Sequence, residues 1–497
     1  MKNRLTKIWQ SPYLLVAMLG IGTILRIVSL NRDSLWFDEA ISYLNATLPV
    51  DKIVSNVVQS SHPPLYYLLL HFWMTLFPDS DGSLRLLGVF WGLLNIPVIY
   101  LLTLELLGSR RLAAWAALLI TISPFQVLFG HELRMYTQLM LLVTLGTYAF
   151  LRAVRSERLA WWSIFLVLFC CAIYTHLFAS LILIALGLYC FIRYRWTKPT
   201  IVMIICGLIL LLFFLPWLLQ LLIERQRDLG TLRPLAQDST RNPLKPLTSL
   251  AFLLIGTSTR PWSTGVALFL TISVIIVLLL EARKASREAE ASNLLLPGLV
   301  VISVIVIPTT FYLVRPYFLP ERTLAGAAPF LLILLAWGTT RYGSPLPYLV
   351  YATAIMMIVG TSLYLVGGPV KPPYRTVMAL VAENRQENDL VLHTSDGSYV
   401  PALRYVDFDN HTLLAGDPDP RKPMNVYEIL GGRVIDGDLK SVEADRMWLI
   451  VALEHSLKWQ EEQTAIFARR YPLLEEEYIG GIGIFLYDLT QLVGENS

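Results

Sequence analysis

The chain has 497 residues, of which 55% are hydrophobic and 15% are charged, and its mean hydropathy is +0.56. Soluble domains carry about 25% charged residues, so this composition excludes an ordinary soluble protein and indicates several membrane spans. The net charge of +3 is too small and too scattered for a nucleic-acid-binding protein. All four cysteines lie inside apolar runs, which favours buried thiols over disulfides or a metal site.

Eleven apolar runs have about the 17 to 25 residues needed to cross the hydrocarbon core of a bilayer. They lie near 12–30, 85–107, 112–130, 135–153, 160–175, 177–194, 199–219, 262–281, 294–312, 324–340 and 346–366. Another apolar stretch, 63–77, ends in Pro and acidic residues, which predicts an interfacial or partly inserted helix, with a twelfth span as the alternative. No cleavable leader is evident, and the run at 12–30 is interpreted as an uncleaved first helix.

The basic residues predict the orientation of these spans. With a cytoplasmic N-terminus, Lys and Arg gather in the cytoplasmic turns and are scarce in the alternate turns, as the positive-inside rule requires. This orientation places the first loop (31–84), the segment 220–250 and everything after residue 366 on the outer face.

The tail of the chain, 367–497, is charged and rich in turns. Helical patterns alternate there with short apolar runs, in the order 374–386, 389–394, 446–453 and 456–469. This alternation predicts a small α/β domain. The predicted fold class is therefore a polytopic α-helical membrane protein with about 11 transmembrane helices, divided into a transmembrane domain (1–366) and an extracytoplasmic α/β domain (367–497).

Ionisable and polar residues gather in the predicted outer loops. The first loop contains "WFDEA", with the adjacent acids Asp38 and Glu39, and "SHPPLYY", with His62. Three later segments end on the same face: "HELRMYTQL" (131–139), "YTHLF", and "RPYFLPERTLAGAAP" (315–329). They add His131, Glu132, Arg134, Tyr136, His176, Tyr317 and Arg322. Their shared face favours a single site.

These residue types fit one kind of chemistry. A carboxylate at the membrane border, with its pKa raised by partial burial, can take a proton from an incoming hydroxyl. Arginines offer forked donors that suit a phosphate. Helical spacing would place His131 and Arg134 on one face at i and i+3. Together, these residues indicate group transfer from a lipid-linked phosphate.

The chain resembles the lipid-phosphate-sugar-dependent glycosyltransferases of the GT-C type (glycosyltransferase family 39), above all the protein O-mannosyltransferases and the bacterial aminoarabinose transferases. The similar segments follow one another in order over about residues 12–340. They are "WFDEA", "HPPLYYLLLHFW", "RLLGVFWGLLNIPVIYLLTLELLGSRRLAAWAALLITISP", "HELRMYTQLMLL", "YTHLF" and "ERTLAGAAPFLLILLAWG". The tail is similar only in position and in its general α/β character.

The resemblance implies roles for individual residues. Asp38 would be the acid that activates the acceptor, and Glu39 would orient Asp38 or touch the acceptor. Arg134 and Arg322 match basic positions that hold the carrier phosphate. His62 lies where the aminoarabinose enzymes have a lysine before paired prolines, and its partial charge near pH 7 makes it a weaker phosphate ligand. Further candidates to line the site are His131, Tyr136, His176 and Tyr317.

The resemblance also implies the reaction, which is inversion at the anomeric carbon with a lipid monophosphate as the leaving group. Such a leaving group can be neutralised by Arg and His, so no cofactor is expected to be required; assistance by a divalent metal stays open, and no residue is assigned as a metal ligand. The expected partners are a polyprenyl-phosphate sugar, an acceptor that is a lipid, glycan or protein, and membrane lipids. The expected location is a bacterial inner membrane.

Each assignment has a structural alternative. The two acids can pair with Arg32 or with lipid headgroups, the arginines can snorkel to the interface, and His62 can serve only to fix a turn. The alternative function is a transporter or flippase of lipid-linked sugars, and a third is a structural membrane subunit. Transporters usually show internal repeats and charges at mid-membrane, whereas here the ionisable groups gather at one face. The sequence specifies neither the sugar nor the acceptor.

Overall fold

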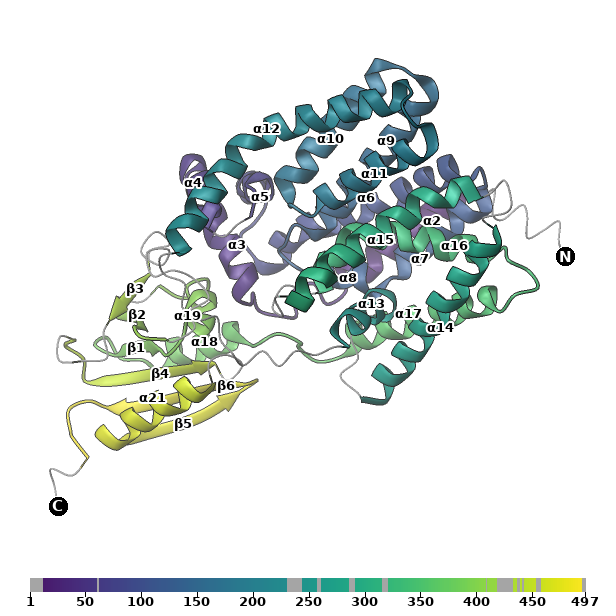
Figure 1. Cartoon of the computed structure of the whole chain (residues 1–497). Helices are drawn as coiled ribbons and strands as arrows, with labels where there is room; N and C mark the ends of the chain where they lie inside the picture. The colour runs from purple at the N-terminus through teal and green to yellow at the C-terminus, as the bar shows by residue number, and fades with distance from the viewer. Residues whose placement is uncertain are drawn as a thin grey trace.

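The computed structural model describes residues 12–59, 62–229, 244–256, 261–285, 291–314, 321–407, 409–417, 432–435, 439, 442–452 and 457–493. Helices fill the described part of the chain as far as Val366, and a region with a β-sheet follows beside them (Figure 1). Of the candidate site residues, Tyr317 lies outside the described residues.

The first half of the helical region carries most of the candidate residues. Its helices are α2 (Pro12–Ile27), α3 (Phe37–Thr47), α4 (Val50–Gln59), α5 (Leu65–Leu76), α6 (Asp81–Leu107), α7 (Arg110–Ile122), α8 (Pro124–Gly130), α9 (Tyr136–Ser156), α10 (Leu159–Thr175) and α11 (Ala179–Tyr194). The second half contains α12 (Lys198–Leu229), α13 (Lys245–Ile255), α14 (Pro261–Ala285), α15 (Ala291–Val314), the 3₁₀ helix η2 (Glu321–Ala327), α16 (Ala328–Gly338) and α17 (Leu346–Val366).

Six of the described helices are long and apolar enough to cross a membrane, namely α6, α9, α12, α14, α15 and α17. The bent pair α7 and α8 makes a seventh candidate. Each of the eleven predicted runs coincides with a helix or a pair of helices, although α2, α10 and α11 are only 16 or 17 residues long. The stretch 63–77 forms α5, whose 12 residues are too few for a span.

The bend between α7 and α8 shapes the segment that leads into the candidate site. Pro124 cannot donate a backbone hydrogen bond and so ends α7, and the Ser123 hydroxyl caps α8 by accepting from the Gln126 amide. The buried Arg26 of α2 donates to the carbonyls of Ile120 (3.0 Å) and Thr121 (3.2 Å), which the end of α7 leaves without helical partners. Arg26 therefore satisfies two of the carbonyls that the bend of 52° leaves free.

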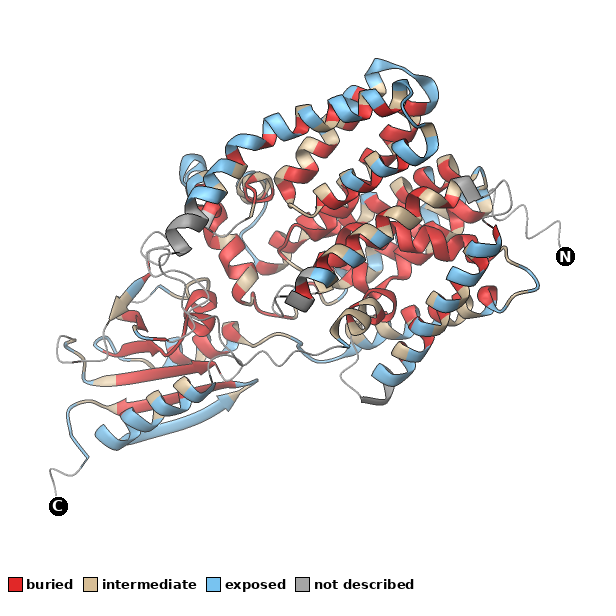
Figure 2. Cartoon of the chain, in the orientation of Figure 1, coloured by how far each residue is buried: buried red, intermediate tan, exposed pale blue. Residues whose placement is uncertain are grey.

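Burial separates central from peripheral helices. The span of α9 is 78% buried inside the protein, whereas those of α12 and α14 are each 28% buried. Figure 2 shows the exposed residues following the outer faces of α12 and α14. Large apolar side chains such as Leu212 and Phe269 are exposed there, as expected for surfaces that face lipid.

The tail folds into a six-stranded sheet with the strand order β3-β2-β1-β4-β6-β5. Strands β3, β2, β1 and β4 run parallel, and β6 and β5 extend the sheet antiparallel. The elements are α18 (Tyr374–Asn384), β1 (Leu390–His393), α19 (Asp396–Ala402), β2 (His411–Leu414), β3 (Arg433–Ile435), β4 (Arg446–Ala452), α21 (Leu457–Arg470), β5 (Leu473–Ile479) and β6 (Ile482–Asp488). The prediction of α/β character is confirmed.

Helices cover both faces of this sheet. Val377 and Val381 of α18 pack with Trp448 of β4 on one face, while Phe467 of α21 packs with Leu449 on the other. The alternation of side chains along β4 sends neighbouring residues to opposite faces. Both faces of the central strands β1 and β4 are therefore buried, as in other sheets with parallel strands, whereas the edge strand β5 is exposed.

The sheet region contacts the helix that carries the two candidate acids. Phe37, Ala40 and Ile41 of α3 form an apolar cluster with Tyr399 and Val400 of α19. Since α3 belongs to the first loop, this packing joins the tail directly to the candidate site.

Candidate active site

The two acids of "WFDEA" lie in the first turn of α3. Successive residues of an α-helix point about 100° apart, so adjacent side chains enter different surroundings. The Asp38 side chain is 24% exposed, whereas that of Glu39 is fully buried. The site thus has one accessible acid and one enclosed acid.

Asp38 lies between two arginines from distant parts of the chain. The guanidinium of Arg322, in η2, forms an ion pair with the Asp38 carboxylate. Arg134 donates from Nη1 to the Asp38 backbone carbonyl at 3.2 Å. The guanidinium of Arg322 also lies 5.6 Å from the centre of the Trp36 ring, within the range of about 6 Å of cation–π contacts. Asp38 therefore lies against two positively charged side chains.

These two arginines determine the protonation state of Asp38. Burial by itself raises the pKa of the carboxyl, but the positive charges of Arg134 and Arg322, with the Arg322 hydrogen bond, lower it to about 2. The expectation of a pKa raised by burial is therefore wrong for this state of the protein, because the sequence did not show that Arg322 pairs with the acid. Asp38 is ionised here.

Arg134 links the first loop to the segment before α9. Its side chain is buried, and it donates to the Ser42 hydroxyl at 3.2 Å and to Nε2 of His62 at 2.9 Å. Arginine can only donate, so Nε2 of His62 accepts this bond. Arg134 therefore ties His62 to the group around Asp38.

Two other candidates lie beside this group. The His176 ring is 5.8 Å from that of His62 and 6.2 Å from that of Tyr136, measured between centroids. Burial, with the nearby Arg134, lowers the pKa of His176 to about 3. Its Nδ1 accepts from the Phe178 amide at 3.2 Å. His176 is thus a neutral neighbour that packs against the site.

Glu39 forms the centre of a separate buried ion cluster. Arg85 of α6 donates to both of its carboxylate oxygens at 2.9 Å, and Lys371 donates to one of them at 2.9 Å. The Leu133 amide adds a bond of 2.8 Å. Burial opposes ionisation, but these cations lower the pKa of Glu39 to about 2. With both oxygens engaged and no exposed surface, Glu39 can orient the loop but is not placed to touch an acceptor.

His131 does not join Asp38. Its Nε2 donates to the Arg26 carbonyl at 2.9 Å, and its Nδ1 accepts from the Tyr364 hydroxyl at 3.1 Å. The predicted helical face shared with Arg134 is wrong, because residues 131–135 form turns between α8 and α9. The bend at Pro124 ends the regular helix shortly before this segment, so i, i+3 spacing does not apply. His131 instead ties α2 to α17.

Several residues of these clusters have no counterpart among the predictions. Arg85 and Lys371, which hold Glu39, come from a predicted span and from the linker into the tail. The sequence does place Arg85 at the start of an apolar run, which could have indicated a charged side chain with a role at the end of a span. The segment "DSD" (79–81), by contrast, is expected from the sequence to be a structural turn, and its Asp79 and Asp81 pair with Arg404 and Arg375 of the tail. In the described ranges, no three His, Cys, Asp or Glu side chains gather as metal ligands would.

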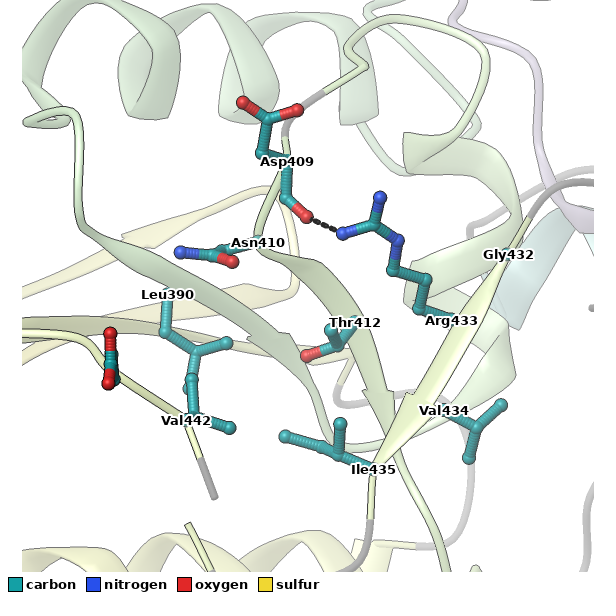
Figure 3. A pocket seen from close by; sticks show the side chains of 10 residues that line it. Leu390, Asp409, Asn410, Thr412, Gly432, Arg433, Val434, Ile435 and Val442 are labelled. Atoms are coloured by element: carbon teal, nitrogen blue, oxygen red, sulfur yellow. Dashed lines mark hydrogen bonds between the residues drawn. The ribbon is translucent and has the colours of Figure 1, made fainter. Parts of the chain in front are cut away.

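A second concave region lies in the tail, apart from Asp38. Figure 3 shows this cavity of about 760 Å³ beside strands β1 to β3. Arg433 lines this cavity, and its guanidinium donates to the backbone carbonyl of Asp409, drawn as a dashed line in the figure. The tail contacts the region around Asp38 elsewhere, through α19 and Lys371.

Comparison with known proteins shows a similarity in sequence over one segment and in fold over most of the chain. Residues 61–219 match the family model described as dolichyl-phosphate-mannose-protein mannosyltransferase. The fold is similar to that of ArnT from Cupriavidus metallidurans in the apo state, with 13% identity, 95% of this chain and 97% of that chain covered, and a TM-score of 0.63. ArnT bound to undecaprenyl phosphate gives 14% identity, the same coverage and a TM-score of 0.61. A comparison with curated sequences gave no match.

The family match covers the segment from His62 to α12, including Arg134, and the fold match covers the helices and the tail together. The resemblance predicted from the sequence is confirmed: residues 61–219 are similar in sequence to the mannosyltransferase family, and the chain as a whole is similar in fold to ArnT.

Proposed function

We propose that the protein moves one sugar from a polyprenyl-phosphate donor to a hydroxyl of a lipid, glycan or protein acceptor on the outer face of the membrane. The observation that carries this proposal is the accessible carboxylate of Asp38 between Arg134 and Arg322, on a loop outside the candidate spans. The similar fold of ArnT bound to undecaprenyl phosphate supports a donor of this class.

In the proposed reaction, the acceptor oxygen attacks the anomeric carbon of the donor sugar. The acceptor hydroxyl gives its proton to Asp38 as the new carbon–oxygen bond forms. The bond from the anomeric carbon to the phosphate oxygen breaks on the opposite side, and the electron pair leaves with the lipid monophosphate. Attack opposite to the leaving group inverts the anomeric carbon.

Arg322 and Arg134 have two roles in this proposal. Guanidinium groups bind phosphate with forked hydrogen bonds, so the donor phosphate would compete with Asp38 for Arg322. Loss of that ion pair would raise the pKa of Asp38 from about 2 and make it a stronger base. Donor binding would thus prepare the acid for the acceptor.

The wider arrangement is also a proposal. Residues 1–366 would form the transmembrane domain and residues 367–497 an extracytoplasmic α/β domain that helps to position the acceptor. The N-terminus would be cytoplasmic, in a bacterial inner membrane. Neither a cofactor nor a metal is assigned a step, because two arginines can neutralise the leaving phosphate.

The test is sugar transfer by purified protein in detergent, with a panel of undecaprenyl-phosphate sugars and with or without chelator. Wild type is expected to release undecaprenyl phosphate and glycosylate an added acceptor lipid. Asp38→Asn should be at least ~100-fold slower, as for loss of a general base. Asp51→Asn, which changes an exposed acid of the same loop, is the control and should match wild type.

Equal rates for wild type and Asp38→Asn would contradict the role of the base. If wild type moves the donor lipid across vesicles without transferring sugar, the flippase alternative replaces the proposal.

A further inference from the structure

A small cavity of about 290 Å³ lies next to the Asp38 site. Its walls come from the start of α3, the turn before α9, the end of α17 and the linker into the tail. The lining residues are Trp36, Leu128, Glu132, Tyr364, Val370, Lys371 and Pro372. No step of the proposed reaction uses this cavity.

Two polar groups of the cavity lack partners. The indole Nε1 of Trp36 is buried without a hydrogen-bond acceptor. Glu132 is half-buried, and its carboxylate forms neither a hydrogen bond nor an ion pair with any of the residues that the structure describes. Buried polar groups are almost always hydrogen-bonded, so the Trp36 indole calls for an explanation. A donor and an acceptor on the wall of one cavity indicate a missing ligand.

The same two residues connect the cavity to the site. The Trp36 ring lies 5.6 Å from the guanidinium carbon of Arg322, which is ion-paired with Asp38. Glu132 is two residues before Arg134, which donates to the Asp38 carbonyl. The ligand of this cavity would therefore lie beside the reacting groups.

The polar and apolar groups that line the cavity indicate which class of ligand it can bind. A hydroxyl can donate to a carboxylate and accept from an indole, and a sugar ring offers several hydroxyls together with an apolar C–H face. Small-molecule pockets begin at about 300 Å³, so this cavity suits one ring better than a lipid chain or a peptide. Burial, the largest effect, raises the pKa of Glu132, and the nearby Lys371 opposes this shift.

We propose that this cavity binds a sugar ring, with one hydroxyl donating to Glu132 and another group accepting from Nε1 of Trp36. The inference rests on the proposed function, since it names the site where the transferred sugar, or a sugar of the acceptor, is recognised. Glu132 and Trp36 would then determine sugar specificity without taking part in proton transfer.

The test uses Glu132→Gln and Trp36→Phe, which remove the charge or the donor with little change in shape. The controls are Glu477→Gln and Trp196→Phe, at exposed positions. Binding of undecaprenyl phosphate and of its mannosyl, glucosyl and aminoarabinosyl esters is measured by native mass spectrometry. Transfer rates are measured with donor and acceptor varied separately.

If the donor sugar occupies the cavity, wild type binds one sugar-bearing lipid more tightly than undecaprenyl phosphate. Glu132→Gln should reduce that advantage about 10- to 100-fold and Trp36→Phe about 3- to 10-fold, as for charged and neutral hydrogen bonds. If an acceptor sugar occupies it, donor binding is unchanged and the acceptor KM rises by similar factors.

Two outcomes overturn the inference in distinguishable ways. Active wild type, with both variants equal to their controls in donor binding and acceptor KM, rejects the cavity while the proposed function stands. Wild type that neither transfers sugar nor distinguishes sugar-bearing lipids from undecaprenyl phosphate rejects the proposed function and the inference with it.

Discussion

Asp38 and Glu39 are adjacent in the first loop, yet their surroundings differ. Asp38 keeps exposed surface and pairs with Arg322, an arginine that is itself partly exposed. Glu39 is enclosed with Arg85 and Lys371 and has both oxygens engaged. One acid is open to a substrate, while the other holds together the first loop, α6 and the tail.

The difference suits an arrangement in which one acid stabilises the loop and the other stays accessible. A buried ion pair contributes little net stability, but removing one partner leaves an uncompensated charge and is costly. The ion pairs of Glu39 therefore hold the start of α3 in place. Because Asp38 is the preceding residue of the same turn, they also fix the orientation of its side chain. The four predictions below test this division, from the largest expected effect to the smallest.

Glu39→Gln should be the most damaging change to folding. The variant leaves Arg85 and Lys371 buried beside a neutral amide, so unfolding should become easier by about 3–5 kcal/mol. Thermal unfolding in detergent measures the loss, with Glu477→Gln as the exposed control. An unchanged midpoint would mean that Glu39 does not hold the loop.

The same cluster predicts a pH dependence. The pKa of Glu39 is about 2 in the folded protein, below the ordinary value of about 4.3 for a glutamate. Its contribution to stability is therefore fully present above about pH 5 and is lost as the pH falls toward 2. Melting midpoints of wild type should fall over this window, and those of Glu39→Gln should fall less. Parallel curves for the two proteins would speak against the ion cluster as the cause.

Lys371→Met tests the link from the tail with a smaller expected effect. Arg85 still binds both oxygens of Glu39, so the buried carboxylate keeps a partner. Loss of one charged hydrogen bond should cost about 1.5–3 kcal/mol. The readout is again the melting midpoint, together with proteolysis of the linker near residue 371. A cost equal to that of Glu39→Gln would show that Lys371, and not Arg85, dominates the cluster.

Asp79→Asn should have the smallest effect. Its side chain is 49% exposed and pairs with Arg404 at 3.0 Å, a type of contact that contributes about 1 kcal/mol or less. Asp81 is buried and still accepts from Arg375 and from the Tyr405 hydroxyl at 2.7 Å. The melting midpoints of Asp79→Asn and Asp81→Asn are compared, and Asp81→Asn should show the larger decrease. Equal decreases would contradict the prediction that Asp79 contributes less.

The sequence predicted much of the fold because periodicity and composition are local properties. Apolar runs long enough for spans, and the short runs of the tail, each became helices or strands at nearly the expected places. Two runs are exceptions: 112–130 bends at Pro124 between α7 and α8, and 324–340 divides into η2 and α16 at Ala327. The sequence also predicted that polar side chains at one end of successive spans lie close together, and Arg134, Arg322 and His62 do lie around Asp38.

What the sequence by itself determined is thus the set of helices and strands and the residue types available at one face. Only the tertiary structure decided which acid stays open, because α6 and the linker supply Arg85 and Lys371 from 46 and 332 residues away. The turn after α8 likewise separates His131 from Arg134 and brings Glu132 to the cavity with Trp36. Such partners meet through long-range packing, and no spacing along the chain encodes the distance between two side chains that different helices carry.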